Sequence, residues 1–457
     1  MKSARTAGAV STNRCRPDRS SRAETFIVCC AAGHGLQGSR RCDRRGYRSS
    51  RHSTRPQSEP WIGDSDMVSK AVLLLSIALV PASASAQQEG VLHKVDTNVF
   101  RPAHQPFSED IVRRLKVPEG FEVSVFARDL GNARMMAVAE DGTVYVTRPN
   151  EKDVIALSEG ASEPRVLVAN LDGIHGIAIR EGRIFLATIH DVIAADLKED
   201  GTIGELATII DDLPDGGQHG RRTLGFAPDG GLHINVGSSC DACFESTEEK
   251  AANLRLDIKD KTRTVFAHGL RNMLGFDWHP ETDVMWGVDH GVDHLGDDLP
   301  GEELNKIEQG AHYGWPFCYG DRQPDWVSFT MPESTPKDEF CRTKTVGPAL
   351  TFEAHASVIN IRFYDADQFP ADYRDDAFVT LRGSANRADP AGYKVVRVTF
   401  ENGEPNGKED FLTGFLSGDG KSEFGRLAGL AIAQDGSLLV SEDTNGVIYK
   451  ITHQAGG

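Results

Sequence analysis

One pattern recurs six times along the chain: a short apolar strand, a tight turn and a second apolar strand. The copies begin at Met135, Gly176, Leu224, Leu274, Ile361 and Gly429. Several of the turns are Asp-Gly, a strong hairpin signal, because the turn needs positive φ angles that glycine adopts freely. Self-similar units of roughly 40 to 60 residues, each about four strands, are typical of β-propellers. The sequence therefore predicts an all-β fold, a six-bladed β-propeller.

The ring is expected to close where the N-terminal end of the domain meets its C-terminal end. Residues 117–126 alternate apolar and polar side chains, which predicts a strand before the first copy. The last copy is followed almost at once by the C-terminus. We expect this N-terminal strand to complete the last blade. The propeller then spans residues 117–453, and residues 87–116 form a polar lead segment.

The first 86 residues differ in composition from the rest of the chain. Residues 1–66 carry 13 Lys and Arg against 6 Asp and Glu and are predicted to be a disordered basic segment. Residues 67–86 have a basic start, a short apolar run and an Ala-Ser-Ala end, which is typical of a secretory signal peptide. The run is too short to span a bilayer.

We therefore expect translation to start at Met67, with residues 1–66 as untranslated upstream sequence. The mature chain is expected to be periplasmic or secreted and to contain no transmembrane segment. The alternative is a basic extension that precedes a membrane anchor. The net charge of −17 argues against a nucleic-acid partner.

Four cysteines follow residue 86: Cys240, Cys243, Cys318 and Cys341. An exported chain meets an oxidising environment, where cysteines tend to pair. The CxxC at 240–243 is also compatible with a redox pair or half of a zinc site, but no second CxxC completes four sulfur ligands. Four cysteines allow three connectivities, of which we favour Cys240–Cys243 with Cys318–Cys341.

The segment from 289 to 303 is crowded with six carboxylates and two histidines. Carboxylates and backbone carbonyls are the ligands that calcium prefers. The two histidines would instead suit zinc or iron. A solvated acidic surface loop is the third interpretation.

Basic and imidazole groups stand directly before the first strand of several copies. They are His175, His219, Arg271, His355 and Arg426. Because the loops of a propeller converge at one end of the central channel, these groups can meet there. Arginine suits an anionic ligand, which it binds through two parallel hydrogen bonds. His219 is the best placed general base, since imidazole titrates near neutral pH. The alternative for each is a loop residue that satisfies turn carbonyls.

Five motifs taken together resemble the glucose/sorbosone dehydrogenase family. They are HGRRTLGFAPDG, GLRNMLGF, DDLPGEELN, GAHYGWPFCYGDRQ and GRLAGLAIAQDGSLLVSED. Proteins of this family are exported six-bladed propellers that use pyrroloquinoline quinone (PQQ) and calcium. The resemblance covers about residues 115 to 453.

The resemblance implies roles for individual residues. His219 is similar to the family's base, which removes the proton from the anomeric hydroxyl of the substrate while hydride passes to the quinone. Arg271 and Asn272 are similar to the pair that contacts the quinone oxygens. Arg426 falls in the region that binds the cofactor carboxylates, and His175 joins these cofactor-binding candidates from its place before the second copy.

The resemblance also implies a calcium site. Gly291 and Val292 are similar to the two residues whose backbone carbonyls bind the ion, with Asp298 and Glu302 as supporting candidates. Gln218 stands where glucose-oxidising members have an acidic residue, and Val292 stands in place of their proline. These departures point toward the sorbosone-like branch.

The sequence thus predicts a PQQ- and calcium-dependent dehydrogenase that oxidises an aldose or sugar aldehyde, sorbosone-like or glucose-like, by hydride transfer to the quinone. Its partners would be a small sugar and an external electron acceptor such as a cytochrome. Two alternatives stay open. One is a calcium-dependent propeller hydrolase such as a lactonase, and the other is a non-catalytic binding propeller.

Overall fold

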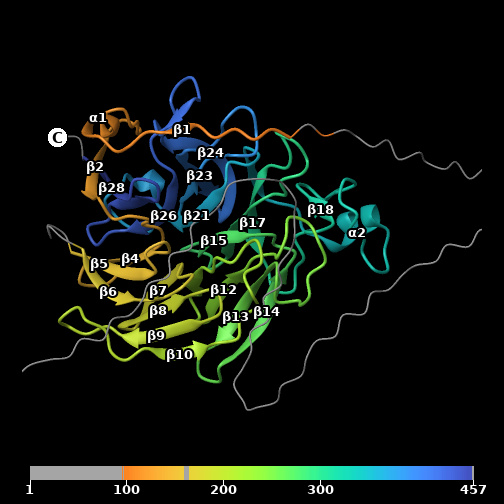
Figure 1. The fold of residues 1–457 in the computed structure, drawn as a ribbon, viewed down its shortest axis with the longest axis horizontal. Coiled ribbons are helices and arrows are strands. Elements are labelled where there is room, and N and C mark those ends of the chain that lie inside the picture. Colours follow the sequence, from red (N-terminus) through yellow and green to blue (C-terminus); the bar gives the residue numbers. More distant parts are fainter. Residues whose placement is uncertain (1–94, 96, 159–163, 455–457) are drawn as a thin grey trace, which may run out of the picture. The chain divides into compact units, whose positions relative to one another are not determined.

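The structure is a computed structural model that describes residues 95, 97–158 and 164–454. Almost all regular structure in these ranges is β-strand (Figure 1). The expected basic segment 1–66 and signal peptide 67–86 lie outside the described residues, so both remain predictions. Among the described helices, none has the length and apolar character needed to cross a membrane.

Six four-stranded antiparallel sheets surround a common axis as the blades of a propeller, which confirms the predicted fold class (Figure 1). The first blade comprises β3 (Met136–Val138), β4 (Val144–Arg148), β5 (Asp153–Leu157) and β6 (Arg165–Ala169). The second comprises β7 (Gly176–Arg180), β8 (Arg183–Ala187), β9 (Val192–Asp196) and β10 (Ala207–Ile210). The third comprises β11 (Leu224–Phe226), β12 (Leu232–Val236), β13 (Ala252–Asp257) and β14 (Thr262–His268).

The remaining three blades follow the same order from the axis outward. The fourth comprises β15 (Met273–Trp278), β16 (Met285–Asp289), β17 (Glu302–Ile307) and β20 (Leu350–Phe352). The fifth comprises β21 (Val358–Phe363), β22 (Ala377–Leu381), β23 (Lys394–Glu401) and β24 (Glu404–Leu412). The sixth comprises β26 (Leu427–Ile432), β27 (Leu438–Glu442), β28 (Val447–His453) and β2 (Phe121–Ala127).

The Asp-Gly pairs form the turns between the first two strands of their blades. Gly142, Gly230 and Gly436 have φ angles of 84°, 90° and 82°, a region that side chains with a Cβ rarely adopt. Each preceding aspartate accepts a hydrogen bond from the backbone N–H two residues later, over 2.9 to 3.0 Å. The local sequence alone therefore fixes these hairpins.

Strand β2 closes the ring as predicted, because it pairs antiparallel with β28 as the outer strand of the sixth blade. It begins at Phe121, four residues later than expected. Pro118 lacks an N–H, and its carbonyl instead accepts a turn hydrogen bond from the N–H of Phe121 over 3.2 Å. Phe121 then packs edge-on against Phe369 and Phe411, which joins the closing strand to the fifth blade.

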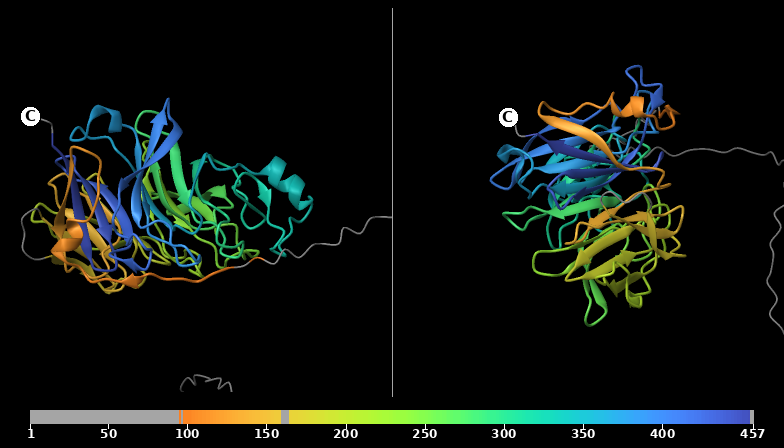
Figure 2. Two further views of the ribbon diagram at one scale, coloured as in Figure 1. Left: turned by 90° about the horizontal axis from the view of Figure 1, so that it is seen from above. Right: turned by 90° about the vertical axis from the view of Figure 1, so that its left-hand side faces the viewer.

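The described part of the lead segment runs across the fourth, fifth and sixth blades (Figure 2). The N–H of Asn98 donates to Asp297, and the N–H of Phe100 donates to the carbonyl of Ala385. Strand β1 (Ala103–His104) then pairs parallel with β25 (Ser422–Glu423), and α1 (Glu109–Val112) follows. The segment is therefore hydrogen-bonded to the propeller along its length.

An insertion separates β17 from β20 in the fourth blade. It contains β18 (Cys318–Tyr319), β19 (Gln323–Pro324) and α2 (Lys337–Lys344). Outside the insertion, a short 3-10 helix (Ala371–Tyr373) lies between β21 and β22 of the fifth blade. A disulfide between Cys318 and Cys341 ties the start of the insertion to α2. The second disulfide joins Cys240 to Cys243. Both predicted pairings are confirmed.

Candidate active site at one end of the propeller axis

The candidate site is a pocket of about 280 Å³ at the end of the axis where the innermost strands begin. The innermost strands β3, β7, β11, β15, β21 and β26 line the axial channel below it. The pocket is lined by Arg134, Gln218, His219, Gly220, Arg221, Asn272, Leu274, His290, Ser357, Ile359 and Arg382. These residues come from the first, third, fourth and fifth blades, so the ring brings together groups up to 248 positions apart in the sequence.

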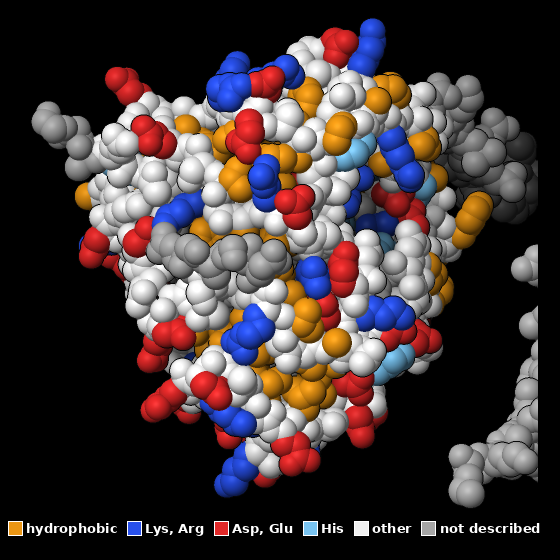
Figure 3. Space-filling view, turned by 60° about the vertical axis from the view of Figure 1, so that its left-hand side comes forward, with side chains coloured by type: hydrophobic (Ala, Val, Ile, Leu, Met, Phe, Trp, Pro, Cys, Tyr) orange, Lys and Arg blue, Asp and Glu red, His pale blue; other side chains and the backbone are white. Residues whose placement is uncertain are grey.

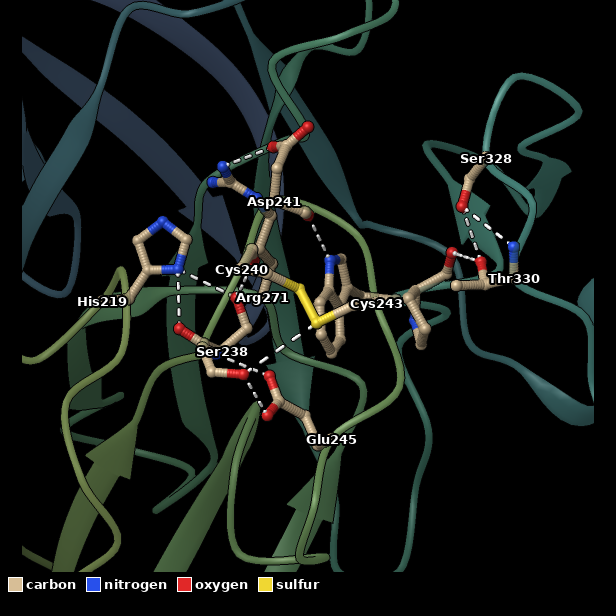
Figure 4. Close-up of a disulfide and its surroundings, with 12 residues drawn as sticks. His219, Ser238, Cys240, Asp241, Cys243, Glu245, Arg271, Ser328 and Thr330 are labelled. Carbon is tan, nitrogen blue, oxygen red and sulfur yellow. Dashed lines mark hydrogen bonds and ion pairs between the residues drawn. A yellow bond between two sulfur atoms is a disulfide. The ribbon is translucent and has the colours of Figure 1, made fainter. Parts of the chain in front are cut away.

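His219 presents one free ring nitrogen. Its Nδ1 lies 3.0 Å from the carbonyl oxygen of Ser238 and 2.8 Å from the Ser238 hydroxyl, which itself donates to the carbonyl of Cys240 over 2.7 Å (Figure 4). Nδ1 therefore carries the proton, because it faces acceptors. Nε2 has no hydrogen-bond partner among the described residues. Burial, followed by the charge of Arg271, lowers the pKa of His219 to about 4, so this imidazole is neutral at pH 7.

Asn272 also lines the pocket. Its Nδ2 donates to Nδ1 of His290 over 3.2 Å, while Nε2 of His290 donates to the carbonyl of Val358. The Oδ1 atom of Asn272 is buried without a partner in the described part of the chain. A buried polar atom without a partner costs free energy, and a bound ligand that donates a hydrogen bond would remove that cost.

Arg271 does not line the pocket, although the sequence predicted that it contacts the cofactor beside Asn272. Its Nη2 donates to Asp241 over 2.7 Å and to Asp293 over 3.3 Å, and its Nε donates to the carbonyl of Asp241 over 3.2 Å. The backbone N–H groups of Arg271 and Asn272 both donate to Asp289. Arg271 therefore fixes the loops around the pocket.

Three guanidinium groups, here called the basic cluster, make one side of the pocket cationic. They are Arg134, Arg221 and Arg382. Arg134 and Arg382 share the carboxylate of Asp443, with Nη2 of Arg382 at 2.8 Å from Oδ1. Burial lowers the pKa of Arg134 to about 9, which still leaves it charged at neutral pH. Asp443 is the one carboxylate in this group, so the cluster carries excess positive charge and suits an anionic ligand.

Arg426 and His175, the other predicted cofactor contacts, lie outside the pocket lining. Arg426 donates to the carbonyls of Arg382 and Gly383, and so holds the segment that carries Arg382. His175 is fully buried: its Nε2 accepts from Nε of Arg134 over 3.1 Å, and its Nδ1 donates to the carbonyl of Arg222 over 2.9 Å. His175 therefore supports Arg134, and Arg426 supports the backbone at Arg382.

The predicted metal loop follows β16. The N–H groups of Gly291 and Ser357 donate to the two carboxylate oxygens of Glu302 over 2.9 and 2.7 Å, and burial raises the pKa of Glu302 to about 7. Glu302 thus supports the loop backbone. The carbonyl oxygens of Gly291 and Val292 accept no hydrogen bond from the described residues. Asp298 is 86% exposed and pairs with Arg387 over 3.1 Å, so it does not reach the pocket.

The pocket fits the chemistry of PQQ, which the sequence motifs implied. A cofactor with three carboxylates suits the basic cluster, and its polar ring atoms suit Asn272, whose buried Oδ1 lacks a partner. None of the three members of the basic cluster was among the site residues predicted from the sequence. Arg221 follows His219 by two positions in the same motif, so the Arg-Arg pair was the available signal.

Comparisons with known proteins show which family this chain resembles. A family model for TrAA12-like proteins matches residues 115–454. The chain is 26% identical over 370 residues to an uncharacterised protein of Borreliella burgdorferi, which covers 76% of this chain and 93% of the relative. It is 25% identical over 294 residues to a pyrroloquinoline quinone-dependent sugar dehydrogenase of Hypocrea jecorina, which covers 54% of this chain and 65% of that protein.

Two solved structures share the fold. The calcium structure of the Trichoderma reesei family AA12 enzyme matches with a TM-score of 0.66 and 24% identity, over 78% of this chain and 98% of that one. The holo form of the PQQ domain of Coprinopsis cinerea pyranose dehydrogenase matches with a TM-score of 0.65 and 20% identity, over 78% and 100%. The family model spans the whole propeller, and the five motifs found in the sequence lie within it. The chain therefore belongs to the TrAA12-like family.

Proposed function

We propose that this protein is an exported dehydrogenase that binds PQQ and calcium and oxidises an aldose or sugar aldehyde. The observation that carries the proposal is one pocket with a neutral imidazole nitrogen, Nε2 of His219, and the basic cluster in its walls. Quinone-dependent sugar dehydrogenases among its relatives support the same assignment.

The residues of the chain would divide the reaction between them. Nε2 of His219 accepts the proton of the sugar hydroxyl, and the hydrogen bond from Nδ1 to Ser238 holds the ring in the tautomer that this step needs. The basic cluster binds the cofactor carboxylates and so fixes the cofactor's position. When bound, PQQ supplies the hydride acceptor.

The free carbonyls of Gly291 and Val292 are the proposed calcium ligands, and Glu302 holds their loop through the N–H of Gly291. Calcium at this position would act as a Lewis acid toward a bound carbonyl oxygen. The electrons leave through an external acceptor such as a cytochrome. Acidic and basic side chains are interspersed on the face that Figure 3 shows, without the single-sign stripe that a nucleic-acid partner would require.

Reconstitution tests the proposal. Purified metal-free protein is titrated with calcium and PQQ, cofactor binding is followed by absorbance, and dye reduction is measured with a panel of aldoses and sugar aldehydes. Saturable binding and sugar-dependent dye reduction are expected. No change in the PQQ spectrum would contradict the proposal, and lactone hydrolysis with calcium alone would support the propeller hydrolase instead.

Export is tested separately. The N-terminus of the protein recovered from the periplasm or the medium is sequenced, and the first residue is expected near Gln87. Peptides from residues 1–66 in the recovered protein would contradict both the signal peptide and the start at Met67.

A further inference from the structure

A groove of about 500 Å³ lies beside the pocket, on the other side of the loop that carries Cys240 and Cys243. One wall is that loop, with Asp241 and Phe244, and the other is the segment 327–330 of the insertion. Figure 4 shows His219 on one side of the Cys240–Cys243 disulfide and Ser328 with Thr330 on the other. The loop therefore lines the groove and lies between it and His219.

Apolar side chains gather on the surface around this groove. Phe329 is 98% exposed, Trp326 63% and Phe244 60%, and Val327 and Met331 are also exposed. Ten large apolar side chains are exposed in the described residues, and these five are half of them. Single exposed apolar residues are ordinary, but a cluster of them marks a binding surface.

The segment 325–331 shows the reverse of the usual surface pattern, because its polar groups turn inward. Asp325 is buried, and its Oδ1 accepts the N–H groups of Val327 and Ser328 over 3.0 Å each. Thr330 Oγ1 donates to the carbonyl of Pro316 over 3.0 Å. The ammonium group of the buried Lys337 donates to the carbonyl of Ser328 over 3.0 Å. These bonds fix the backbone while the aromatic side chains face outward.

The two walls are also held at a fixed separation. Nδ1 of His294 lies 2.6 Å from Asp241 on one wall, and Nε2 lies 2.7 Å from Asp325 on the other. One disulfide closes the loop of the first wall, and the other lies within the insertion that supplies the second wall. A groove fixed before ligand binding loses little conformational entropy when it binds.

We propose that this groove is a subsite for the non-reacting sugar units of an oligosaccharide. The inference rests on the proposed function. Sugar rings have an apolar C–H face, which suits exposed aromatic rings, and hydroxyl edges, which suit the carboxylate of Asp241 and the hydroxyl of Ser328. A chain whose end unit reaches His219 would cross the loop at 240–243, so one sugar ring does not fill both sites.

The test compares tetrasaccharides with their monomers. Cellotetraose, xylotetraose and maltotetraose are titrated calorimetrically into the mature chain without cofactor, and then assayed as substrates with PQQ and calcium. The variants are Phe329→Ala and the double variant Trp326→Ala/Phe329→Ala. Val166→Ala is the matched control, because Val166 is also exposed but lies on the outer strand of the first blade. Thermal unfolding of each variant checks the fold.

For at least one tetrasaccharide we expect the double variant to weaken binding and kcat/KM about tenfold, with the monomer unaffected and Val166→Ala unchanged. The inference is overturned if none of the three binds more tightly than its monomer, or if the variants bind them equally well. Loss of self-association in the double variant, without a change in sugar binding, would assign the surface to a second copy of the chain. Tetrasaccharide binding without any dye reduction would contradict the dehydrogenase but leave the groove as a sugar-binding site.

Discussion

Asp241 accepts a hydrogen bond from Arg271, with Oδ1 2.7 Å from Nη2, and this pair joins the disulfide loop to the segment that leads into β15. The same carboxylate contacts His294 through its other oxygen at 2.6 Å. Burial opposes the charge of Asp241, but the hydrogen bond from His294 and the charge of Arg271 outweigh it and hold the pKa of Asp241 well below its usual range. One carboxylate thus connects the candidate active site to the neighbouring groove.

Asp241→Asn is expected to lower the free energy of unfolding by roughly 1 to 3 kcal/mol, because it removes the nearer of the two carboxylate charges that pair with buried Arg271. Urea denaturation measures the loss. Asp172→Asn is the control, since its ion pair with Lys152 is exposed on both sides and solvent screening leaves such a pair little effect on stability. Equal effects of the two substitutions would show that Arg271 does not depend on Asp241.

His219→Gln is expected to reduce kcat by about 10²- to 10⁴-fold, because glutamine fills the space but does not accept the substrate proton as a base. The affinity for PQQ, followed by its absorbance, should stay within a factor of about three, since the basic cluster is intact. His190→Gln at an exposed position is the control. Full activity in His219→Gln would exclude this histidine as the base.

The acid limb of the pH profile is expected near pH 4. The reactive form of His219 is the neutral one, and its pKa is lowered from 6.5 to about 4 by burial and the charge of Arg271. Protonation therefore inactivates the enzyme only when the pH falls toward 4, and kcat/KM should be flat between about pH 5.5 and 7. A limb with a midpoint near 6.5 would mean that the imidazole titrates as it does in water.

Gly291→Ala is expected to weaken calcium binding. A Cβ at this position would lie 2.5 Å from Cγ of Pro300, so the loop that carries the proposed carbonyl ligands must shift. Calcium at 100 times its dissociation constant should stabilise the parent protein by about 2.7 kcal/mol, visible as a rise in the unfolding temperature, and the variant should lose most of it. Gly418→Ala is the control, because nothing lies within 4 Å of its added Cβ. An unchanged calcium response in Gly291→Ala would place the ion elsewhere.

Replacing both Cys318 and Cys341 with serine is expected to lower the free energy of unfolding by about 3 kcal/mol, because their disulfide closes a loop with a sequence separation of 23. The Cys240–Cys243 disulfide closes a loop with a sequence separation of only 3. Replacing both of these cysteines with serine should therefore lower the free energy of unfolding by less. Denaturant titrations of both variants test the order. A larger loss at Cys240/Cys243 would point to the contacts of Asp241 as the dominant effect.

The hairpins, the blades and the ring closure were predictable because each depends on short stretches of sequence. Asp-Gly turns specify strand pairs locally, and six copies with one extra strand leave one simple way to close the ring. His219 and Asn272 were predictable as pocket residues from their motifs. The start of β2 was predicted four residues too early, because Pro118 and the turn that follows it override the alternating pattern.

The partners of each charged side chain were not predictable in the same way. Arg271 and Arg426 carry the expected residue type in the expected loops, yet their hydrogen bonds to Asp241 and to the carbonyl of Gly383 direct them away from the pocket. The members of the basic cluster lie in three different blades, and Asp443, which pairs with Arg134 and Arg382, lies 309 positions from Arg134. No local pattern encodes such contacts.

The sequence by itself determined the propeller, its closing strand and the histidine in the pocket, since turn chemistry, strand periodicity and short motifs act over a few residues. Only the tertiary structure decided which arginines face the pocket and which support it, and that the insertion turns its aromatic side chains outward beside the pocket. Those outcomes depend on how six loops pack at one end of the ring, where each polar group bonds to whichever partner the neighbouring blades bring within reach.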